Sequence, residues 1–236
     1  MYAKTGNMKR IATLISTSLI AASLTCCGQS VTPQKAKDVG SVFLKDTVPN
    51  NLSKYSQATL ASGCFWHEQT LFESIKGVVC VVPGYAGGGK TWPKYEDVEK
   101  GTTGHAETVD IYYDSSKVSF GTLLDVYFDA MADPTQVNGQ GVDEGTQYRS
   151  VIFYHTPNQK RLAQEHIDAL NKSGKYQKPI AAQVMPFTLF WPAEDAHQHY
   201  LNVHTTEPYV VKSINEIARY QAAHASLIKP GHDFAK

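Results

Sequence analysis

The spacing of apolar residues divides the middle of the chain into short strands and amphipathic helices. Alternating or continuous apolar runs of strand length lie near residues 57–61, 78–82, 108–113, 151–154 and 180–186. Helical patterns lie near 65–76, 95–100, 120–131, 158–173, 193–201 and 211–225. Thr156-Pro157 provides a helix start for one of them. The alternation predicts one domain of mixed α and β structure over residues 54–228, followed by a tail at 229–236.

The first part of the chain has the pattern of a targeting segment. Lys9 and Arg10 precede the apolar, hydroxyl-rich run 11–24, which is too short to span a bilayer but has the length of a signal-peptide core. The run ends in the letters LTCCG at 24–28, which resemble a bacterial lipobox. We therefore predict a signal peptide over residues 1–27.

The lipobox-like end predicts a membrane anchor. Cys27 is the preferred lipidation site and Cys26 is the alternative, while ordinary cleavage beside two incidental cysteines stays open. Residues 28–53 are polar and rich in Lys, Ser, Asp and Pro, as expected for a flexible tether. The expected location is the bacterial cell envelope, as an exported lipoprotein that faces the periplasm.

Composition excludes some classes of function. The 236 residues include 22 basic and 22 acidic side chains, so the formal net charge at pH 7 is zero. A neutral chain lacks the electrostatic attraction that binds nucleic acid or an acidic membrane surface. Without the leader and tail the length suits a single domain, and no internal repeat is apparent.

One cysteine stands where the first predicted strand gives way to the first predicted helix. Gly63 precedes Cys64, and the aromatic residues Phe65 and Trp66 follow it. Backbone N–H groups and the macrodipole at a helix start stabilise an anion, so we expect this thiol to ionise more readily than a free cysteine, whose pKa is about 8.5. Cys64 is therefore a candidate nucleophile. The competing interpretation is a small buried cysteine among core aromatic residues.

Four glycine-containing motifs follow one another along the chain, namely GCFW at 63–66, GYAGG at 84–88, GHAE at 104–107 and GTQYRS at 145–150. In this order they resemble the type A peptide methionine sulfoxide reductases, and the likeness runs from about residue 58 to about residue 209. The resemblance implies an α+β fold, a ferredoxin-like two-layer sandwich of a mixed β-sheet with packed helices. It also implies reduction of the S epimer of methionine sulfoxide, free or in proteins, which repairs oxidised proteins.

The resemblance assigns roles to residues in and near these motifs. The Cys64 thiolate would attack the sulfoxide sulfur, and Glu107 would be the acid that protonates the oxygen. Tyr95 and Tyr148 would donate hydrogen bonds to that oxygen, and Phe65 and Trp66 would enclose the S-methyl group. Asp143 would bind the backbone N–H of the methionine residue. His105 and Gln147 would support the residues that contact the substrate. The role of His67 stays open.

The cysteine count predicts how such an enzyme is recycled. Cys26 and Cys27 belong to the leader, so the domain holds only Cys64 and Cys80, and we expect Cys80 to be buried within a strand. Related reductases commonly have a recycling cysteine near the C-terminus, whereas no cysteine follows Cys80 here. The sequence therefore resembles a one-cysteine variant.

A one-cysteine reductase needs an external reductant for its Cys64 sulfenic acid. The candidates are a thioredoxin-like protein, glutaredoxin with glutathione, or dithiothreitol. No bound cofactor and no metal is expected. The expected partners are oxidised proteins and peptides, the thioredoxin-like reductant and, through the lipid anchor, a membrane. We expect a monomer that binds no nucleic acid.

Two other functions and one other site are alternatives. A cysteine hydrolase or acyltransferase would use Cys64, His105 and Asp143 as a triad, which requires His105 within hydrogen-bonding reach of the sulfur. A non-enzymatic surface lipoprotein would leave the four motifs unexplained. Acidic and histidine residues also gather in 194–204, but their spacing matches no standard metal site, and we favour a polar helix there.

Overall fold

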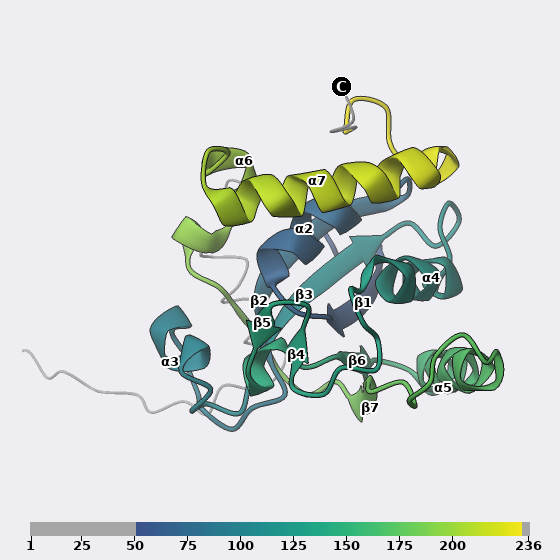
Figure 1. The fold of residues 1–236 in the computed structure, drawn as a ribbon, viewed down its shortest axis with the longest axis horizontal. Helices are drawn as coiled ribbons and strands as arrows, with labels where there is room; N and C mark the ends of the chain where they lie inside the picture. The colour runs from purple at the N-terminus through teal and green to yellow at the C-terminus, as the bar shows by residue number, and fades with distance from the viewer. Residues whose placement is uncertain (1–50, 233–236) are drawn as a thin grey trace, which may run out of the picture. The chain divides into compact units, whose positions relative to one another are not determined.

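The structure, a computed structural model, describes residues 51–232 and alternates strands with helices along the chain (Figure 1). The strands are β1 (Ser56–Ala61), β2 (Val78–Ala86), β3 (Ala106–Tyr113), β4 (Gly139–Gln140), β5 (Asp143–Glu144), β6 (Val151–Tyr154), β7 (Gln183–Pro186) and β8 (Phe190–Pro192). The helices are α2 (Phe65–Glu73), α3 (Tyr95–Glu99), α4 (Phe120–Ala130), α5 (Pro157–Lys172), α6 (Tyr200–Val203) and α7 (Pro208–Ala223). Short 3₁₀ helices occur at Thr146–Tyr148 (η1), Asp195–His197 (η2) and Ala225–Leu227 (η3).

The main sheet has the strand order β7-β6-β1-β3-β2-β8. Neighbouring strands are antiparallel except β6 and β7, which run parallel. Within it, β6-β1-β3-β2 are connected through α2 and α4 in the βαββαβ order of a ferredoxin-like sandwich. The predicted α+β fold with a mixed sheet is therefore confirmed. The strands β4 and β5 form a separate small hairpin.

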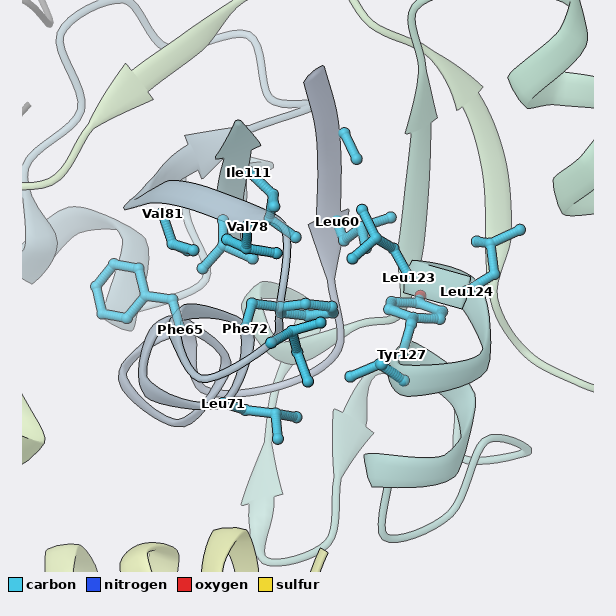
Figure 2. Packing of buried hydrophobic residues seen from close by; sticks show 14 of the residues in the cluster. Leu60, Phe65, Leu71, Phe72, Val78, Val81, Ile111, Leu123, Leu124 and Tyr127 are labelled. Atoms are coloured by element: carbon cyan, nitrogen blue, oxygen red, sulfur yellow. The ribbon is translucent and has the colours of Figure 1, made fainter. Parts of the chain in front are cut away.

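The largest apolar cluster joins the sheet to α2 and α4. Figure 2 shows side chains that meet there: Phe65, Leu71 and Phe72 from α2, Leu123, Leu124 and Tyr127 from α4, and Leu60, Val78, Val81 and Ile111 from the strands. Complete burial of one such side chain contributes roughly 1.5–3 kcal/mol. This packing fixes α2 on the sheet, and it thereby fixes Cys64 directly before the first turn of the helix.

The last helix, α7, lies alongside α2 (Figure 1). Val210 and Ile217 of α7 are fully buried and belong to the same apolar cluster as α2. Pro208 opens the helix, a position where its fixed φ and missing N–H are well tolerated. This docking brings the first turn of α7, including Tyr209, toward the start of α2.

The structure differs from the sequence prediction at the end of β2. The apolar pattern predicts an end at Val82, but the strand continues through Pro83 and Gly84 to Ala86. Gly84 makes this possible, because a Cβ there would lie 2.3 Å from the backbone oxygen of Trp191 in the neighbouring strand β8. A Pro-Gly pair usually marks a turn, which is why the sequence favours one here.

The segment 193–201, which the sequence predicts as a helix, is not continuous helix. It follows β8, a strand that pairs with the end of β2, and then forms η2 and the beginning of α6. His199 separates the two with a left-handed backbone, φ 52°, that no α-helix accommodates. The other predicted elements are present with modest changes of bounds, including an earlier end of α2 at Glu73 and a later start of β7 at Gln183.

The predicted leader cannot be compared with this fold. The signal peptide at 1–27, with Cys26 and Cys27, and most of the tether at 28–53 lie outside the described residues. The tail predicted at 229–236 is described only as far as His232. Within residues 51–232, no helix is long and apolar enough to cross a membrane.

Candidate active site

Cys64 is the N-cap of α2, as the sequence predicts. The chain turns from β1 into the helix at Gly63, whose φ of 107° favours glycine. A Cβ at Gly63 would also lie only 2.8 Å from the Cβ of Gln140. The turn leaves Cys64 only 9% exposed at the start of the helix.

Glu107 lies beside this helix start, near the beginning of β3, and is only 1% exposed. Its Oε2 accepts a hydrogen bond from the backbone N–H of Phe65, the first residue of α2, at 3.1 Å. Burial, with a smaller contribution from the Asp143 and Glu99 carboxylates, raises the pKa of Glu107 to about 8 in spite of that bond. At neutral pH Glu107 therefore holds a proton that it can donate.

The expectation of a readily ionised thiol is wrong for the resting site. Burial, followed by the Glu107 carboxylate in its charged form, raises the pKa of the Cys64 thiol well above its ordinary value. A hydrogen bond with the Tyr209 hydroxyl and one with the backbone of the helix start act in the opposite direction. Loss of solvation outweighs the helix start, so Cys64 and Glu107 both hold protons at neutral pH.

Tyr209 is a site residue that the sequence analysis did not identify. Its hydroxyl donates a hydrogen bond to Asp143 Oδ2 at 3.0 Å and also lies within hydrogen-bonding reach of the Cys64 sulfur. Cys64, Asp143 and Tyr209 line a pocket of about 80 Å³. His67 lines the same pocket, and burial lowers its pKa to about 4, so its ring is neutral at pH 7.

Aromatic rings form another wall near Cys64. The ring centroid of Trp66 lies 3.7 Å from that of Tyr200 and 6.0 Å from that of Tyr95. The Tyr95 ring stacks on His197 at 4.0 Å, and the ring of the fully buried Phe65 lies 6.1 Å from that of Trp66. The structure thus brings the predicted pair Phe65 and Trp66 together and adds two rings, Tyr200 and His197, that the sequence analysis did not assign to the site.

The two predicted hydroxyl donors come from different segments, Tyr95 from α3 and Tyr148 from η1. Burial raises the pKa of both phenols, and Glu107 and Cys64 in their ionised forms raise it further. Both therefore keep their protons. Among residues 51–232, neither hydroxyl has a hydrogen-bond partner. Both are available to donate to an oxygen that binds near Cys64 and Glu107.

His105 and Gln147 hold the loops of the site. His105 Nδ1 accepts a hydrogen bond from the Gly88 N–H at 3.1 Å. The other ring nitrogen, Nε2, therefore carries the proton and donates to the Lys90 carbonyl oxygen at 2.7 Å. Both ring nitrogens are thus occupied and cannot accept a thiol proton, so the geometry does not support a hydrolase triad. Gln147 donates to the Glu99 carbonyl at 2.8 Å and ties η1 to the end of α3.

Glu194, His199 and His204, three of the acidic and histidine residues of 194–204, have different partners. Glu194 accepts hydrogen bonds from the Tyr85 hydroxyl at 2.9 Å and from the Tyr95 N–H at 3.0 Å. His199 Nδ1 lies 3.3 Å from Glu73 Oε1, and His204 Nδ1 lies 2.8 Å from Glu207 Oε1. In the described part of the chain, no three His, Cys, Asp or Glu side chains are grouped so as to hold a metal ion. Glu194 instead anchors the start of α3 to β2.

A second buried carboxyl, Glu68, lies in the first turn of α2 and is only 2% exposed. One of its oxygens accepts a hydrogen bond from Ser62, while Oε2 has no partner among the described residues. Burial raises the pKa of Glu68 well above its usual range, with a further contribution from Glu107. The carboxyl therefore keeps its proton to a higher pH than an exposed glutamate does, and the sequence analysis assigned it no role.

Cys80 is in β2, as predicted, but it is half-buried and not fully buried. The strand has an irregular register between Val78 and Cys80, and the Cys80 side chain packs against a smaller apolar cluster that includes Val82 and Phe153. Burial raises the pKa of Cys80 to about 12. This thiol is therefore a poor nucleophile, and it packs against a different cluster from the helix that carries Cys64.

Comparisons with known proteins agree with this arrangement. A family model described as peptide methionine sulfoxide reductase matches residues 56–226. Peptide methionine sulfoxide reductase MsrA 2 of Mesorhizobium japonicum is 49% identical over 154 residues, which cover 65% of this chain and 79% of the relative. Peptide methionine sulfoxide reductase MsrA of Polynucleobacter asymbioticus is 41% identical over 188 residues, which cover 79% and 98%.

Solved structures resemble the fold as well. Methionine sulfoxide reductase A of Corynebacterium diphtheriae is similar with a TM-score of 0.57 and 33% identity, over 64% of this chain and 76% of that one. The reduced form of Mxr1 from Saccharomyces cerevisiae is similar with a TM-score of 0.59 and 31% identity, over 69% and 92%. The family match, over residues 56–226, includes both Cys64 and Glu107.

Proposed function

The chain belongs to the peptide methionine sulfoxide reductase family, and we propose that it reduces the S epimer of methionine sulfoxide with Cys64 as nucleophile and Glu107 as acid. Reduction of methionine sulfoxide follows from family membership. The roles of the individual residues and the choice of epimer are the proposal. One observation carries it, which is the protonated Glu107 carboxyl held by the Phe65 N–H beside the thiol.

The proposed reaction starts from protonated Cys64 and protonated Glu107. Glu107 gives its proton to the sulfoxide oxygen while the Cys64 sulfur attacks the substrate sulfur, and the thiol proton then returns Glu107 to its acid form. The S–S bond formed by this attack then breaks as the oxygen passes from the substrate sulfur to the Cys64 sulfur. The substrate S–O bond is thereby replaced by an S–O bond on Cys64, methionine leaves, and Cys64 is a sulfenic acid. The substrate sulfur gains two electrons, the Cys64 sulfur loses two, and no net proton is consumed.

Four further side chains would orient the substrate. Tyr95 and Tyr148 donate hydrogen bonds to the oxygen as negative charge develops there. The S-methyl group packs against Trp66 and its neighbouring rings, and Asp143 accepts the backbone N–H of the methionine. A site that holds methyl, oxygen and backbone at three separate places admits one configuration at sulfur, which supports the choice of the S epimer.

A single-turnover assay tests this proposal. Reduced enzyme is mixed with each sulfoxide epimer separately, and dithiothreitol is added only in parallel samples that allow many turnovers. We expect about one methionine per enzyme from the S epimer and none from the R epimer. Equal yields from the two epimers would contradict the proposed pocket. Absence of product from both would contradict the assignment of the reaction to this site.

We further propose that an external thiol reduces the Cys64 sulfenic acid. The high pKa of Cys80 and its packing in a separate cluster support this over an internal disulfide. A thioredoxin-like protein, or glutaredoxin with glutathione, would form a mixed disulfide with Cys64 and then release the reduced enzyme. Steady-state rates with each reductant at equal thiol concentration identify the preferred class.

The leader supports an exported, lipid-anchored enzyme at the bacterial cell envelope. In this proposal Cys27 carries the lipid, and residues 28–53 connect it to the reductase domain on the periplasmic side. Labelling of growing cells with a palmitate analogue tests it. Cys27→Ser should abolish incorporation, and the matched variant Cys26→Ser should keep it. Loss of incorporation in Cys26→Ser alone would assign the lipid to Cys26. If the unmodified protein incorporates no label, the protein has no lipid anchor.

A further inference from the structure

Trp92 has a strained and exposed conformation close to the active site. Its φ of 51° lies in the left-handed region, which a bulky side chain rarely adopts, and half of its side chain is exposed (50%). Burial in the free protein therefore does little to offset the strain. Strained residues of this kind occur preferentially where a protein binds a ligand.

Trp92 forms one side of an apolar groove. Its ring lies 4.6 Å from that of Trp191 at an angle of 55°, and Pro93, Pro192 and Ala193 complete the apolar walls. The groove has a volume of about 390 Å³, within the range of pockets that bind small groups. Trp191 is only 4% exposed, so one wall is fixed by the core while the Trp92 wall faces solvent.

A hydrogen bond of Glu194 links the groove to Tyr95 of the active site. Glu194 lines the groove and accepts a hydrogen bond from the Tyr95 N–H at 3.0 Å, and the Tyr95 phenol is close enough to Cys64 and Glu107 to respond to their charges. An extended polypeptide advances about 3.3 Å per residue. A substrate chain that leaves the site past Tyr95 therefore brings a side chain to the groove within a few residues.

We propose that this groove between Trp92 and Trp191 binds an aromatic or branched aliphatic side chain of the same polypeptide that presents methionine sulfoxide to Cys64. The subsite rests on the proposed function and narrows its substrate class. The rings and prolines offer favourable contacts to such a side chain. The groove carries the carboxylates of Glu194 and Asp195 against the one ammonium of Lys94, and this negative balance disfavours an acidic side chain.

This specificity would distinguish folded from unfolded substrates. Methionine in folded proteins is packed among other apolar residues, which are not accessible together to an enzyme. Once a protein has unfolded, a methionine sulfoxide and an apolar neighbour become accessible on one extended segment. The groove therefore favours oxidised chains that have lost their fold.

Peptide kinetics test the subsite. A set of blocked heptapeptides carries methionine S-sulfoxide at the centre, with one Phe, Ser or Glu placed at each flanking position in turn. For at least one position, we expect the Phe peptide to have a kcat/KM about tenfold above the Ser peptide, chiefly through KM, and the Glu peptide to fall below both. N-acetyl methionine S-sulfoxide, which has no flanking side chain, serves as the reference substrate.

Three variants separate binding from folding. Trp92→Ala and Trp92→Asn should reduce the Phe preference to less than about twofold and leave kcat/KM for the reference substrate unchanged. The Asn variant is included because Asn tolerates a left-handed backbone, in case Ala destabilises the loop. Val203→Ala removes another exposed apolar side chain and should change nothing. Equal losses on every substrate, or no Phe preference in the unmodified enzyme, would overturn the subsite. Failure to reduce even the reference substrate would overturn the proposed function, and the subsite with it.

Discussion

The backbone N–H of Phe65 donates to Glu107 Oε2 at 3.1 Å, so the proposed acid is bound to the first residue of the helix whose N-cap is the proposed nucleophile. Glu107→Gln keeps a carbonyl acceptor for this bond but removes the acidic proton. We expect it to slow methionine formation in a single turnover by roughly 10²- to 10⁴-fold. Rapid-quench chromatography measures the rate, and an unchanged far-UV spectrum serves as control. An unaltered rate would mean that another group delivers the proton.

The rate of methionine formation should fall as pH rises through about 8, the pKa to which burial raises Glu107. Below this pH Glu107 is protonated and can donate, whereas above it the carboxylate has no proton and repels the developing thiolate. Single-turnover rate constants over a pH series from about 6 to 10 should give an apparent pKa near 8 that belongs to the Cys64–Glu107 pair. Glu107→Gln should lack this decline, and its persistence in the variant would contradict the assignment.

Cys64→Ser should abolish methionine release, whereas Cys80→Ser should leave the first turnover intact. Cys80 has a pKa of about 12 and packs against a different apolar cluster from α2, so we do not expect it to resolve the sulfenic acid. After substrate is added without reductant, a sulfenic acid probe should label one cysteine, and intact mass should show no loss of two hydrogens. A disulfide between Cys64 and Cys80 that forms as fast as methionine is released would contradict the one-cysteine mechanism.

Tyr209→Phe should lower kcat/KM for a blocked peptide by roughly 10- to 100-fold, the effect expected from losing a hydrogen bond to a charged group. The change removes the donor to Asp143 Oδ2 and the hydroxyl whose hydrogen bond lowers the pKa of Cys64. Alkylation of Cys64 as a function of pH provides the second measurement. Its midpoint should move to higher pH in the variant, and an unmoved midpoint would show that Tyr209 does not act on the thiol.

Glu68→Gln should make the domain more stable at alkaline pH relative to the unmodified protein. Burial raises the pKa of Glu68 in the folded state, whereas in the unfolded chain it is about 4.3. The folded state therefore retains a proton that the unfolded state loses, so Glu68 lowers stability as pH rises above about 4.3. Calorimetry near pH 4 and pH 8 should show a difference in Tm between variant and unmodified protein that grows with pH. A difference independent of pH would mean that folding does not raise the pKa of Glu68.

Local signals in the sequence predict an element well where no distant contact competes with them. The apolar run of β6 and the Thr156-Pro157 start of α5 are examples, and Thr156 indeed accepts the cap hydrogen bond from the Gln159 N–H. At Gly84 the sequence indicates a turn, but the chain continues as a strand. The glycine is needed there because β8 approaches so closely that no side chain fits. The approach of β8 depends on residues more than a hundred positions away, which no local pattern contains.

The same distinction holds in the candidate site. Cys64 and Glu107 lie in recognisable motifs, so the sequence identifies them. Tyr209 and Glu194 acquire their positions only when α7 docks on α2 and when β8 pairs with β2. The helix start at Cys64 was visible in sequence, but the burial that outweighs its effect on the thiol depends on the folded surroundings.

The buried, protonated Cys64 also determines which oxidants can damage this protein. Peroxides and alkylating reagents react with the thiolate, a form that the high pKa keeps scarce in the resting site. In the proposed reaction a bound sulfoxide differs, because its oxygen accepts the Glu107 proton and the attack needs no preformed thiolate. We therefore expect peroxides and alkylating reagents to modify Cys64 slowly compared with its reaction with a bound sulfoxide. A repair enzyme built this way survives in the oxidising surroundings that create its substrate.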